Sequence, residues 1–269
     1  MASRAKSSRI ARSTASRPAE PGPARRGAGP RHGIARAISK LGICSRTDAA
    51  RAVREGRVAL NGRCVRDPET PVDLARDRIR LDGRELRAAE RVYLMLNKPR
   101  GYVTTARDEQ GRETVYTLLE AADLPWVAPV GRLDKASEGL LLLTNDSAWA
   151  ARVTAPESRI AKTYHVQIDR LPDEALLALL RQGVEDRGEP LRPESVTELR
   201  RGGRNAWLEI VLTEGRNREI RRLLAAHGVG VLRLVRIAIG GLALGTLARG
   251  GFRRLDPGEA GRLASVSIP

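Results

Sequence analysis

The chain has 269 residues, 41% of them hydrophobic, and its 48 basic residues outnumber 32 acidic ones, which gives a formal net charge of +16. Such an excess of positive charge favours a polyanionic partner, nucleic acid above all, over a neutral one. No apolar run approaches the roughly 18 residues of a transmembrane helix, and the N-terminal segment lacks the apolar part of a signal peptide. We therefore expect a cytoplasmic protein without a membrane partner.

Residues 1–31 consist mainly of Ser, Ala, Pro, Gly and Arg, with eight basic residues against a single acid, Glu20. A segment of this composition cannot bury enough apolar surface to fold alone. We expect it to be a disordered basic arm, which either holds nucleic-acid phosphates or is a solvated tail without a dedicated role.

Two short helices and two tight hairpins are predicted next. Apolar residues within 34–41 recur at helical spacing, and Ser45, with an acid three residues later, begins a second helix that ends at Gly56. Asn-Gly at 61–62 and Asp-Gly at 82–83 each predict a two-residue turn between short strands. The residues that the second helix is expected to bury are Ala49, Ala50 and Val53.

The segment AISKLGICSRTDAARAVREGRVALNGRCV, residues 37–65, contains SR, EGRV and NG in the order typical of one RNA-binding module. It resembles the S4 domain, which is named for a small-subunit ribosomal protein. The resemblance extends over residues 32–80 and departs at its start, where HGIARAISK replaces a more basic opening. It implies a small domain, placed here at residues 32–90, that docks on structured RNA.

Basic side chains lie one helical turn apart on both predicted helices. This spacing allows a stripe of positive charge beside the buried face, suited to phosphate contacts. For any single residue, a solvated helix surface is the alternative. The candidate RNA-binding residues of this domain are Arg36, Lys40, Arg46, Arg51 and Arg54.

We expect a linker at residues 87–91, followed by a strand-rich domain that begins with VYLMLNKP at residues 92–99. The four leucines at 140–143 are typical of a central strand that is buried on both faces. Further predicted elements are a helix between Pro172 and Gly183, a hairpin over residues 195–213 with its turn at Gly202-Gly203, and a basic amphipathic helix over residues 217–228.

The segment GRLDKASEGLLLLTND, residues 131–146, places one carboxylate between a glycine turn and the predicted buried strand. Asp134 should therefore project from a rigid support, which suits a catalytic group. Taken alone, the pattern favours a plainer role, in which the aspartate caps the following turn through backbone N–H groups.

The whole segment resembles the signature of the pseudouridine synthase superfamily, in which GRLD carries the essential aspartate and GLLLLTND is typical of the branch that modifies ribosomal RNA. Three further segments are similar to motifs of that branch and follow in the same order: NKPRGYVTT at 97–105, AKTYHVQI at 161–168 and LTEGRNREIRRLL at 212–224. Small departures are Ser137 in place of threonine, Ser147 in place of glycine and Glu219 in place of glutamine.

This resemblance implies an α+β protein in which the S4 domain precedes a catalytic domain, residues 91–256, with a mixed, largely antiparallel sheet. Residues 257–269 are expected to be a C-terminal tail. The implied activity is the isomerisation of a uridine in ribosomal RNA to pseudouridine. A glycoside hydrolase uses two carboxylates, whereas this signature offers one, which suits an isomerase that excludes water and whose leaving group is also its nucleophile.

Three catalytic residues follow from the resemblance. Asp134 acts at the ribose, either as a nucleophile at C1′ or as a base at C2′. Tyr164 stacks on the uracil, with a core tyrosine on an alternating strand as the alternative. Arg221 pairs with Asp134; Arg218 is the second candidate for this partner, and a phosphate contact is the alternative role for Arg221.

Other basic residues of the motifs are candidate RNA contacts. Arg132 resembles a side chain that enters the space left by a flipped uridine, with a salt bridge within the loop as the alternative. Lys162 shares a strand face with Tyr164 and either binds a phosphate or braces the tyrosine. The remaining candidates are Arg216 and Arg218.

Neither a metal nor a small-molecule cofactor is expected, because two cysteines and three scattered histidines offer no zinc spacing and the sequence has no glycine-rich nucleotide motif. The expected partner is ribosomal RNA or an assembling ribosomal subunit, bound by a monomer. The LNKPRGYVTT opening and the basic extension favour large-subunit (23S) RNA, with small-subunit (16S) RNA as the alternative. From another class, the alternatives are a non-catalytic ribosome-assembly factor and a general RNA chaperone.

Overall fold

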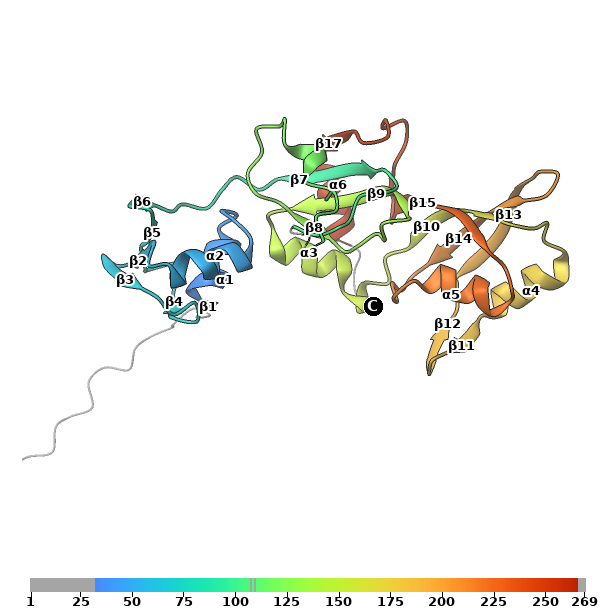
Figure 1. Cartoon of the computed structure of the whole chain (residues 1–269), viewed down its shortest axis with the longest axis horizontal. Coiled ribbons are helices and arrows are strands. Elements are labelled where there is room, and N and C mark those ends of the chain that lie inside the picture. Colours follow the sequence, from blue (N-terminus) through green and yellow to red (C-terminus); the bar gives the residue numbers. More distant parts are fainter. Residues whose placement is uncertain (1–31, 107, 109, 266–269) are drawn as a thin grey trace, which may run out of the picture.

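The computed structural model describes residues 32–106, 108 and 110–265. The basic arm expected at residues 1–31 lies outside this part of the chain. Figure 1 shows a small N-terminal unit of two helices and short strands, joined by an irregular segment to a larger unit around one long sheet. Within the described residues, no helix has the length and apolar character that crossing a membrane requires.

The two predicted helices of the N-terminal unit are α1 (Ile34–Lys40) and α2 (Arg46–Arg54). The predicted start of α2 is confirmed, because the Ser45 hydroxyl accepts the N–H of Asp48. Both helices contribute to one apolar cluster together with the short strands of the unit. The buried residues of α2 are Ala49, Ala52 and Val53, so Ala52 takes the place expected for Ala50, which is half-buried.

Short strands complete this unit: β2 (Val58–Leu60), β3 (Arg63–Val65), β5 (Ile79–Leu81) and β6 (Arg84–Glu85) form a sheet in the order β3-β2-β5-β6, and β1 (His32–Gly33) pairs with β4 (Pro71–Val72). Both predicted hairpins are confirmed. Their central residues have positive φ, 51° and 84° at Asn61-Gly62 and 50° and 79° at Asp82-Gly83. Positive φ at both positions is typical of the type I′ turn, which Asn-Gly and Asp-Gly adopt readily.

The connection between the two units, residues 86–92, contains no helix or strand. Hydrogen bonds fix it on both sides, because Ala89 N–H donates to Leu41 O and Val92 N–H donates to Asn145 Oδ1. Asn145 Nδ2 also donates to Glu90 O. The asparagine of the GLLLLTND motif therefore holds the connection against the larger unit.

Nine strands form the sheet of the larger unit: β7 (Tyr93–Lys98), β8 (Ala128–Val130), β9 (Glu138–Thr144), β10 (Lys162–Ile168), β13 (Ser195–Arg201), β14 (Ala206–Leu212), β15 (Val231–Ile239), β16 (Leu242–Ala243) and β17 (Phe252–Arg254). The main path runs β13-β14-β10-β15-β9-β7-β17, with β16 beside β15 and β8 beside β9. The pairing of β15 with β9 is parallel and the others are antiparallel. This is the mixed, largely antiparallel sheet of an α+β fold that the resemblance implied.

Two apolar clusters lie on opposite faces of this sheet, and β9 contributes to both. Its Leu141 and Leu143 belong to the larger cluster, and its Leu140 and Leu142 to the smaller. All seven residues of β9 are buried, which confirms the predicted central strand. The larger cluster also contains residues of α4 (Glu174–Gln182) and α5 (Glu219–Ala226), and the smaller contains residues of α3 (Ser147–Thr154) and α6 (Pro257–Ala264).

The helix predicted before Gly183 is α4, and the predicted hairpin is the pair β13–β14. The predicted basic helix is α5, which is two residues shorter than expected at each end. The remaining short elements are the 3-10 turns η1 (Thr117–Leu119) and η2 (Pro156–Ser158) and the hairpin of β11 (Val184–Asp186) with β12 (Glu189–Leu191).

The C-terminal tail expected from residue 257 is wrong for residues 257–264, which form α6. A capping box of Asp256 and Glu259 starts this helix. Leu263 is 3% exposed in the smaller apolar cluster, and Trp149 Nε1 of α3 donates to Ala260 O at 2.8 Å. The partner of α6 lies more than a hundred residues earlier in the chain, and so short a helix shows no periodicity that reveals it.

We expect Leu263→Ala to destabilise the larger unit by about 2–5 kcal/mol, because it leaves a cavity beside α3. Urea unfolding of the full chain measures this. Arg262→Ala, at an exposed position of the same helix, is the matched control and should stay within about 0.5 kcal/mol. Equal, small effects of both changes would show that α6 adds nothing to the fold.

Candidate active site

A cavity of about 710 Å³ opens where β9 changes its neighbours. β15 pairs with the first two residues of β9 and β8 with its last three, so the sheet divides beside the segment that leads into β9. The volume is within the roughly 300–1,000 Å³ of small-molecule sites. Seven residues predicted from the sequence line this cavity: Arg132, Asp134, Lys162, Tyr164, Arg216, Arg218 and Arg221.

The approach of β15 to β9 depends on Gly139. This residue has a φ of +100°, and a Cβ there would overlap the main-chain oxygen of Arg236. Glycine is the residue that adopts this conformation without strain and leaves room for the neighbouring backbone. The glycine of the GLLLLTND motif therefore allows the parallel pairing at the edge of the cavity.

The loop that carries Asp134 is held by the segment NKPRGYVTT, which begins with the last two residues of β7. Thr104 Oγ1 donates to the carbonyl of residue 133 at 2.7 Å, and Gly101 N–H donates to the carbonyl of residue 135 at 2.8 Å. Within the loop, Ser137 N–H donates to the Asp134 carbonyl at 2.9 Å. The carboxylate therefore projects from a backbone that is fixed on several sides, as the sequence predicted for a rigid support.

Lys98, the last residue of β7, is the central support of this loop. Its side chain is fully buried, and Nζ donates to the carbonyls of Asp134, Ser137 and Pro99 at 3.1, 2.8 and 3.1 Å. These three acceptors match the three N–H donors of an ammonium group. Burial lowers the Lys98 pKa to about 8. Sequence reasoning assigned no role to this lysine, and its one signal was its place in the NKPRGYVTT motif.

The ion-pair partner of Asp134 is Arg218, the second candidate from the resemblance, in place of Arg221, which was the first. Arg218 Nη1 lies 3.7 Å from Asp134 Oδ2, whereas Arg221 Nη2 donates to Ala136 O at 3.4 Å. Burial lowers the pKa of Arg221, and the charge of Asp134 opposes this effect. Arg218 precedes α5, which begins at Glu219, whereas Arg221 lies within the helix.

Arg218 has a left-handed backbone, with a φ of 50° and a ψ of 32°. Side chains other than glycine rarely adopt this region, and strained residues of this kind gather at functional sites. The guanidinium is about half exposed, so the pair with Asp134 faces the open side of the cavity.

Tyr164 and Lys162 line the cavity together from β10, as strand alternation predicted. Tyr164 is 8% exposed and also belongs to the larger apolar cluster, so it is at once a core residue and part of the cavity wall. Lys162 Nζ donates to Ile160 O at 3.0 Å, and burial lowers the Lys162 pKa. The lysine is therefore partly desolvated, unlike an ordinary surface cation.

Three carboxylates line the cavity, and their surroundings differ. Burial raises the pKa of Glu219, whose Oε2 accepts the N–H of Arg216. The carboxylate of Glu214 lies 2.7 Å from Arg216 Nε. Asp134 is the member of this group that stands on the immobilised loop. The arrangement therefore favours Asp134 as the carboxylate that acts on a ligand.

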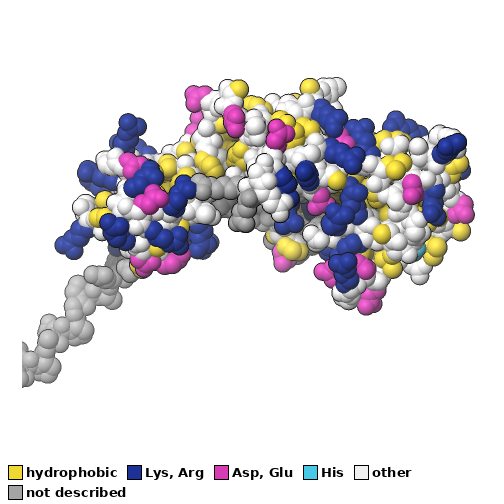
Figure 2. Space-filling view, in the orientation of Figure 1, with side chains coloured by type: hydrophobic (Ala, Val, Ile, Leu, Met, Phe, Trp, Pro, Cys, Tyr) yellow, Lys and Arg dark blue, Asp and Glu magenta, His cyan; other side chains and the backbone are white. Residues whose placement is uncertain are grey.

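Positive charge prevails around the cavity, with six basic residues in its lining: Arg132, Lys162, Arg216, Arg218, Arg221 and Arg236. Arg236 was not predicted from the sequence. Figure 2 shows Lys and Arg side chains distributed over both units on the face in view, interspersed with acidic ones. Such a surface suits a polyanion. Across the described residues, His, Cys, Asp and Glu side chains form no group of three or more that could hold a metal ion.

Glu138, the first residue of β9, anchors the strand that follows the Asp134 loop. Its carboxylate is 4% exposed and accepts hydrogen bonds from Arg233 Nε and Nη2 at 2.8 and 2.9 Å, while Arg249 Nη2 lies 3.2 Å away. The hydrogen bonds from Arg233 lower the Glu138 pKa. Such a bidentate, charge-assisted pair fixes geometry, and here it ties β9 to β15 next to the cavity.

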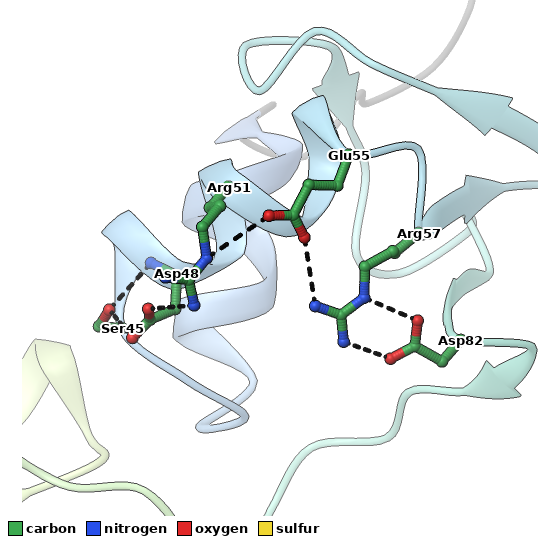
Figure 3. A network of polar contacts seen from close by, with 6 residues as sticks. All are labelled: Ser45, Asp48, Arg51, Glu55, Arg57 and Asp82. Carbon is green, nitrogen blue, oxygen red and sulfur yellow. Dashed lines mark hydrogen bonds and ion pairs between the residues drawn. The ribbon is translucent and has the colours of Figure 1, made fainter.

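The predicted RNA-binding arginine Arg51 is already paired within the N-terminal unit. Figure 3 shows it between two acids of its own helix segment, 3.0 Å from Asp48 and 3.8 Å from Glu55. Glu55 also lies 3.4 Å from Arg57, which forms a second pair with Asp82. The positive charge of Arg51 is thus largely compensated before any RNA arrives.

The other candidate residues of α1 and α2 differ in the partners that they contact. Arg46 lies 3.3 Å from Glu69, and Lys40 Nζ lies 2.8 Å from a histidine ring nitrogen. Arg36 and Arg54 are exposed, and in the part of the chain that the structure describes neither side chain forms a hydrogen bond or an ion pair. Their charges are available for phosphates.

Comparison with known proteins identifies the family. Residues 92–226 match the model of the RNA pseudouridylate synthase family, and residues 33–79 match that of the S4 domain. The chain belongs to the RNA pseudouridylate synthase family. This result confirms both resemblances that the sequence motifs carried, and it makes the chain an RNA pseudouridine synthase with an N-terminal S4 domain.

Relatives of this synthase match over most of its length. An uncharacterized RNA pseudouridine synthase of Aquifex aeolicus is 38% identical over 228 residues, which are 84% of this chain and 91% of the relative. The ribosomal large subunit pseudouridine synthase B of Bacillus subtilis is 33% identical over 238 residues, 87% of this chain and 96% of the relative. A crystal structure of a pseudouridylate synthase has 30% identity and a TM-score of 0.60, and the match covers 87% of this chain and 99% of that one.

We expect the free energy of unfolding of the synthase to depend on pH through Glu138. Because Arg233 lowers its folded-state pKa, this carboxylate contributes stability above its ordinary pKa of 4.5, and the contribution is lost as pH falls through the lower folded-state value. The free energy of unfolding should therefore fall less between about pH 6 and about pH 3 in Glu138→Gln than in the wild type. Glu85→Gln, at an exposed position, is the control and should behave as the wild type. Parallel curves for all three proteins would contradict the role of the pair.

Proposed function

We propose that this synthase isomerises a uridine of ribosomal RNA to pseudouridine and that Asp134 is its catalytic carboxylate. The observation that carries the proposal is the immobilised loop: Asp134 projects into a basic cavity from a backbone held by Lys98, Gly101 and Thr104. A reaction centred on one carboxylate needs that carboxylate fixed relative to the ribose. The two other acids in the lining, Glu214 and Glu219, do not stand on this loop, and Glu219 is buried with a raised pKa.

The chemistry needs no second carboxylate. The N1–C1′ bond of the uridine breaks, the uracil turns in place, its C5 bonds to C1′, and the C5 proton leaves while N1 ends with a proton. Asp134 either adds at C1′ or removes a proton from C2′, and both routes use an ionised carboxylate. No water is consumed, so one acid suffices where a hydrolase uses two.

The neighbouring residues fit supporting roles. Arg218 balances the charge of Asp134 through its ion pair, and Arg221 holds the loop by donating a hydrogen bond to Ala136 O. Tyr164 presents a ring at the cavity wall for stacking on the uracil. A uridine in folded RNA must leave its stack to reach this cavity. Arg132, an exposed residue of the cavity lining, would fill the gap that the uridine leaves.

The S4 domain supports a folded RNA as the substrate, and the Bacillus subtilis relative, named for the large ribosomal subunit, supports 23S over 16S RNA. We propose that the synthase acts as a cytoplasmic monomer on ribosomal RNA or an assembling subunit, without a cofactor. Phosphate contacts from the S4 helices would supply much of the affinity.

Asp134→Asn is expected to abolish isomerisation while leaving RNA affinity within a few-fold of the wild type, because it keeps the shape of the side chain and removes its charge. Pseudouridine mapping in 23S and 16S RNA from cells with the wild type, the variant or no protein measures the isomerisation. One position in 23S RNA should be modified with the wild type alone. Asp123→Asn, at an exposed position, is the control and should retain the modification.

Other outcomes decide between the alternatives. A pseudouridine that is present with the wild type and missing from 16S RNA in cells without the protein would assign the substrate to the small subunit. Retention of a tenth of the single-turnover rate, a barrier change of about 1.4 kcal/mol, would remove Asp134 from the reaction. RNA binding by a wild-type protein that forms no pseudouridine would indicate a non-catalytic assembly factor.

The S4 domain offers a matched pair for testing phosphate contacts. Arg54→Gln should reduce the slope of log affinity against log salt by roughly 0.7–0.9, because it removes one uncompensated charge. Arg51→Gln should change the slope less, since Asp48 and Glu55 already balance that charge. Binding titrations on the same RNA at several salt concentrations measure both. An unchanged slope for Arg54→Gln would place the RNA contacts elsewhere.

A further inference from the structure

Arg236 is a buried cation in the lining of the cavity, and the proposed reaction has not yet used it. It lies on β15 directly opposite Tyr164 of β10 and is 4% exposed. Its Nε donates to Leu140 O at 2.7 Å. Its Nη2 is buried without a hydrogen-bond partner, and no carboxylate in the described part of the chain lies within ion-pair distance of its guanidinium.

Such an arrangement lowers the stability of the protein when no ligand is bound. A guanidinium stays protonated in proteins, and a buried charge without a partner is strongly destabilising. Two further cations, Lys98 and Lys162, lie near this guanidinium. Burial lowers the pKa of both lysines, and repulsion from the charge of Arg236 adds to this effect. A ligand that brings a hydrogen-bond acceptor to the Arg236 guanidinium would supply the missing partner.

The depth of Arg236 favours a base over a phosphate as the acceptor. Phosphates remain on the RNA backbone, and the more exposed arginines, such as Arg132 and the half-exposed Arg218, are placed to meet them. A flipped nucleotide enters a pocket with its base leading. The acceptors on a uracil are its carbonyl oxygens O2 and O4, and a guanidinium donates to such oxygens.

We propose that Arg236 is a further catalytic residue, one that donates from its guanidinium to a carbonyl oxygen of the target uracil. This inference rests on the proposed function. When the N1–C1′ bond breaks, its electron pair passes to N1 and is delocalised onto O2 and O4, so the contacted oxygen gains negative charge. A fixed cation at that oxygen binds the departing base more tightly than the intact nucleoside, which lowers the barrier. The electron pair then forms the bond between C5 and C1′, and the negative charge on the contacted oxygen disappears.

Sulfur substitution at the target uridine tests the contact, since sulfur accepts hydrogen bonds more weakly than oxygen. We would compare single-turnover rates at saturating enzyme for RNA with uridine, 2-thiouridine or 4-thiouridine at the target, using the wild type, Arg236→Met and Arg236→Lys. For one of the two thio substitutions, the ratio of the uridine rate to the thiouridine rate should be about tenfold or more larger in the wild type than in Arg236→Met. A factor of ten corresponds to about 1.4 kcal/mol. Arg236→Met should also slow the uridine substrate by about tenfold or more. Arg236→Lys should recover part of this loss, because it keeps the charge without the planar fork.

Three results would overturn the proposal. Thio effects of the same size in the wild type and in the Arg236 variants would show that the residue does not contact a carbonyl. A salt slope reduced by roughly 0.7–0.9, with thio effects unchanged, would assign Arg236 to a phosphate instead. A wild-type protein that fails to convert even uridine would remove the proposed function itself, and this inference with it.

Two controls keep the test decisive. Arg254→Gln removes one cation at an exposed position of the edge strand β17, outside the cavity, and should leave all thio ratios unchanged. Thermal unfolding shows which Arg236 variants are folded. If Arg236→Met does not fold, Arg236→Lys carries the comparison; if neither folds, equal wild-type rates on uridine and both thio substrates overturn the proposal, and a loss confined to one of them supports it.

Discussion

The buried ammonium of Lys98 is the interaction on which the rest of the site depends. An isolated cation inside a protein is costly, and here three carbonyl oxygens, two of them from the Asp134 loop, replace the water it has lost. The same contacts join the end of β7 to the segment that leads into β9. The loop cannot shift without exposing the charge of Lys98 to an apolar surrounding, so the position of Asp134 is fixed by electrostatics as much as by packing.

The division of the sheet turns this rigid loop into a site. Because β9 pairs with β15 at its start and with β8 at its end, the two neighbours diverge and a cavity opens between them. Gly139 permits the close approach on one side, and Glu138 with Arg233 secures it. Strand residues such as Tyr164 and Arg236 form part of the wall of this cavity and are held by the pairing of β10 with β15, which suits a reaction whose base must turn without leaving.

Charge is distributed in the cavity according to depth. The arginines nearer solvent, among them Arg218 with its left-handed backbone, are suited to phosphates and to the Asp134 carboxylate. The deeper cations Lys162 and Arg236 are desolvated, so each interacts more strongly with a ligand than a surface residue does. In the S4 domain, acids already balance Arg51, whereas Arg54 remains uncompensated. Position within the fold, more than the number of basic residues, sets what each one contributes.

Local patterns in the sequence determined the helices and I′ turns of the S4 domain, the buried strand β9 and the place of Asp134, because capping, turn chemistry and apolar runs act over a few neighbouring residues. The motifs likewise determined the family. Tertiary structure alone decided that Arg218 rather than Arg221 pairs with Asp134, that Lys98 supports the loop, that Arg236 lines the cavity and that residues 257–264 pack as a helix. Each of these depends on contacts between residues far apart in the chain, or on where a helix begins to within one residue, and spacing along the sequence does not encode such distances.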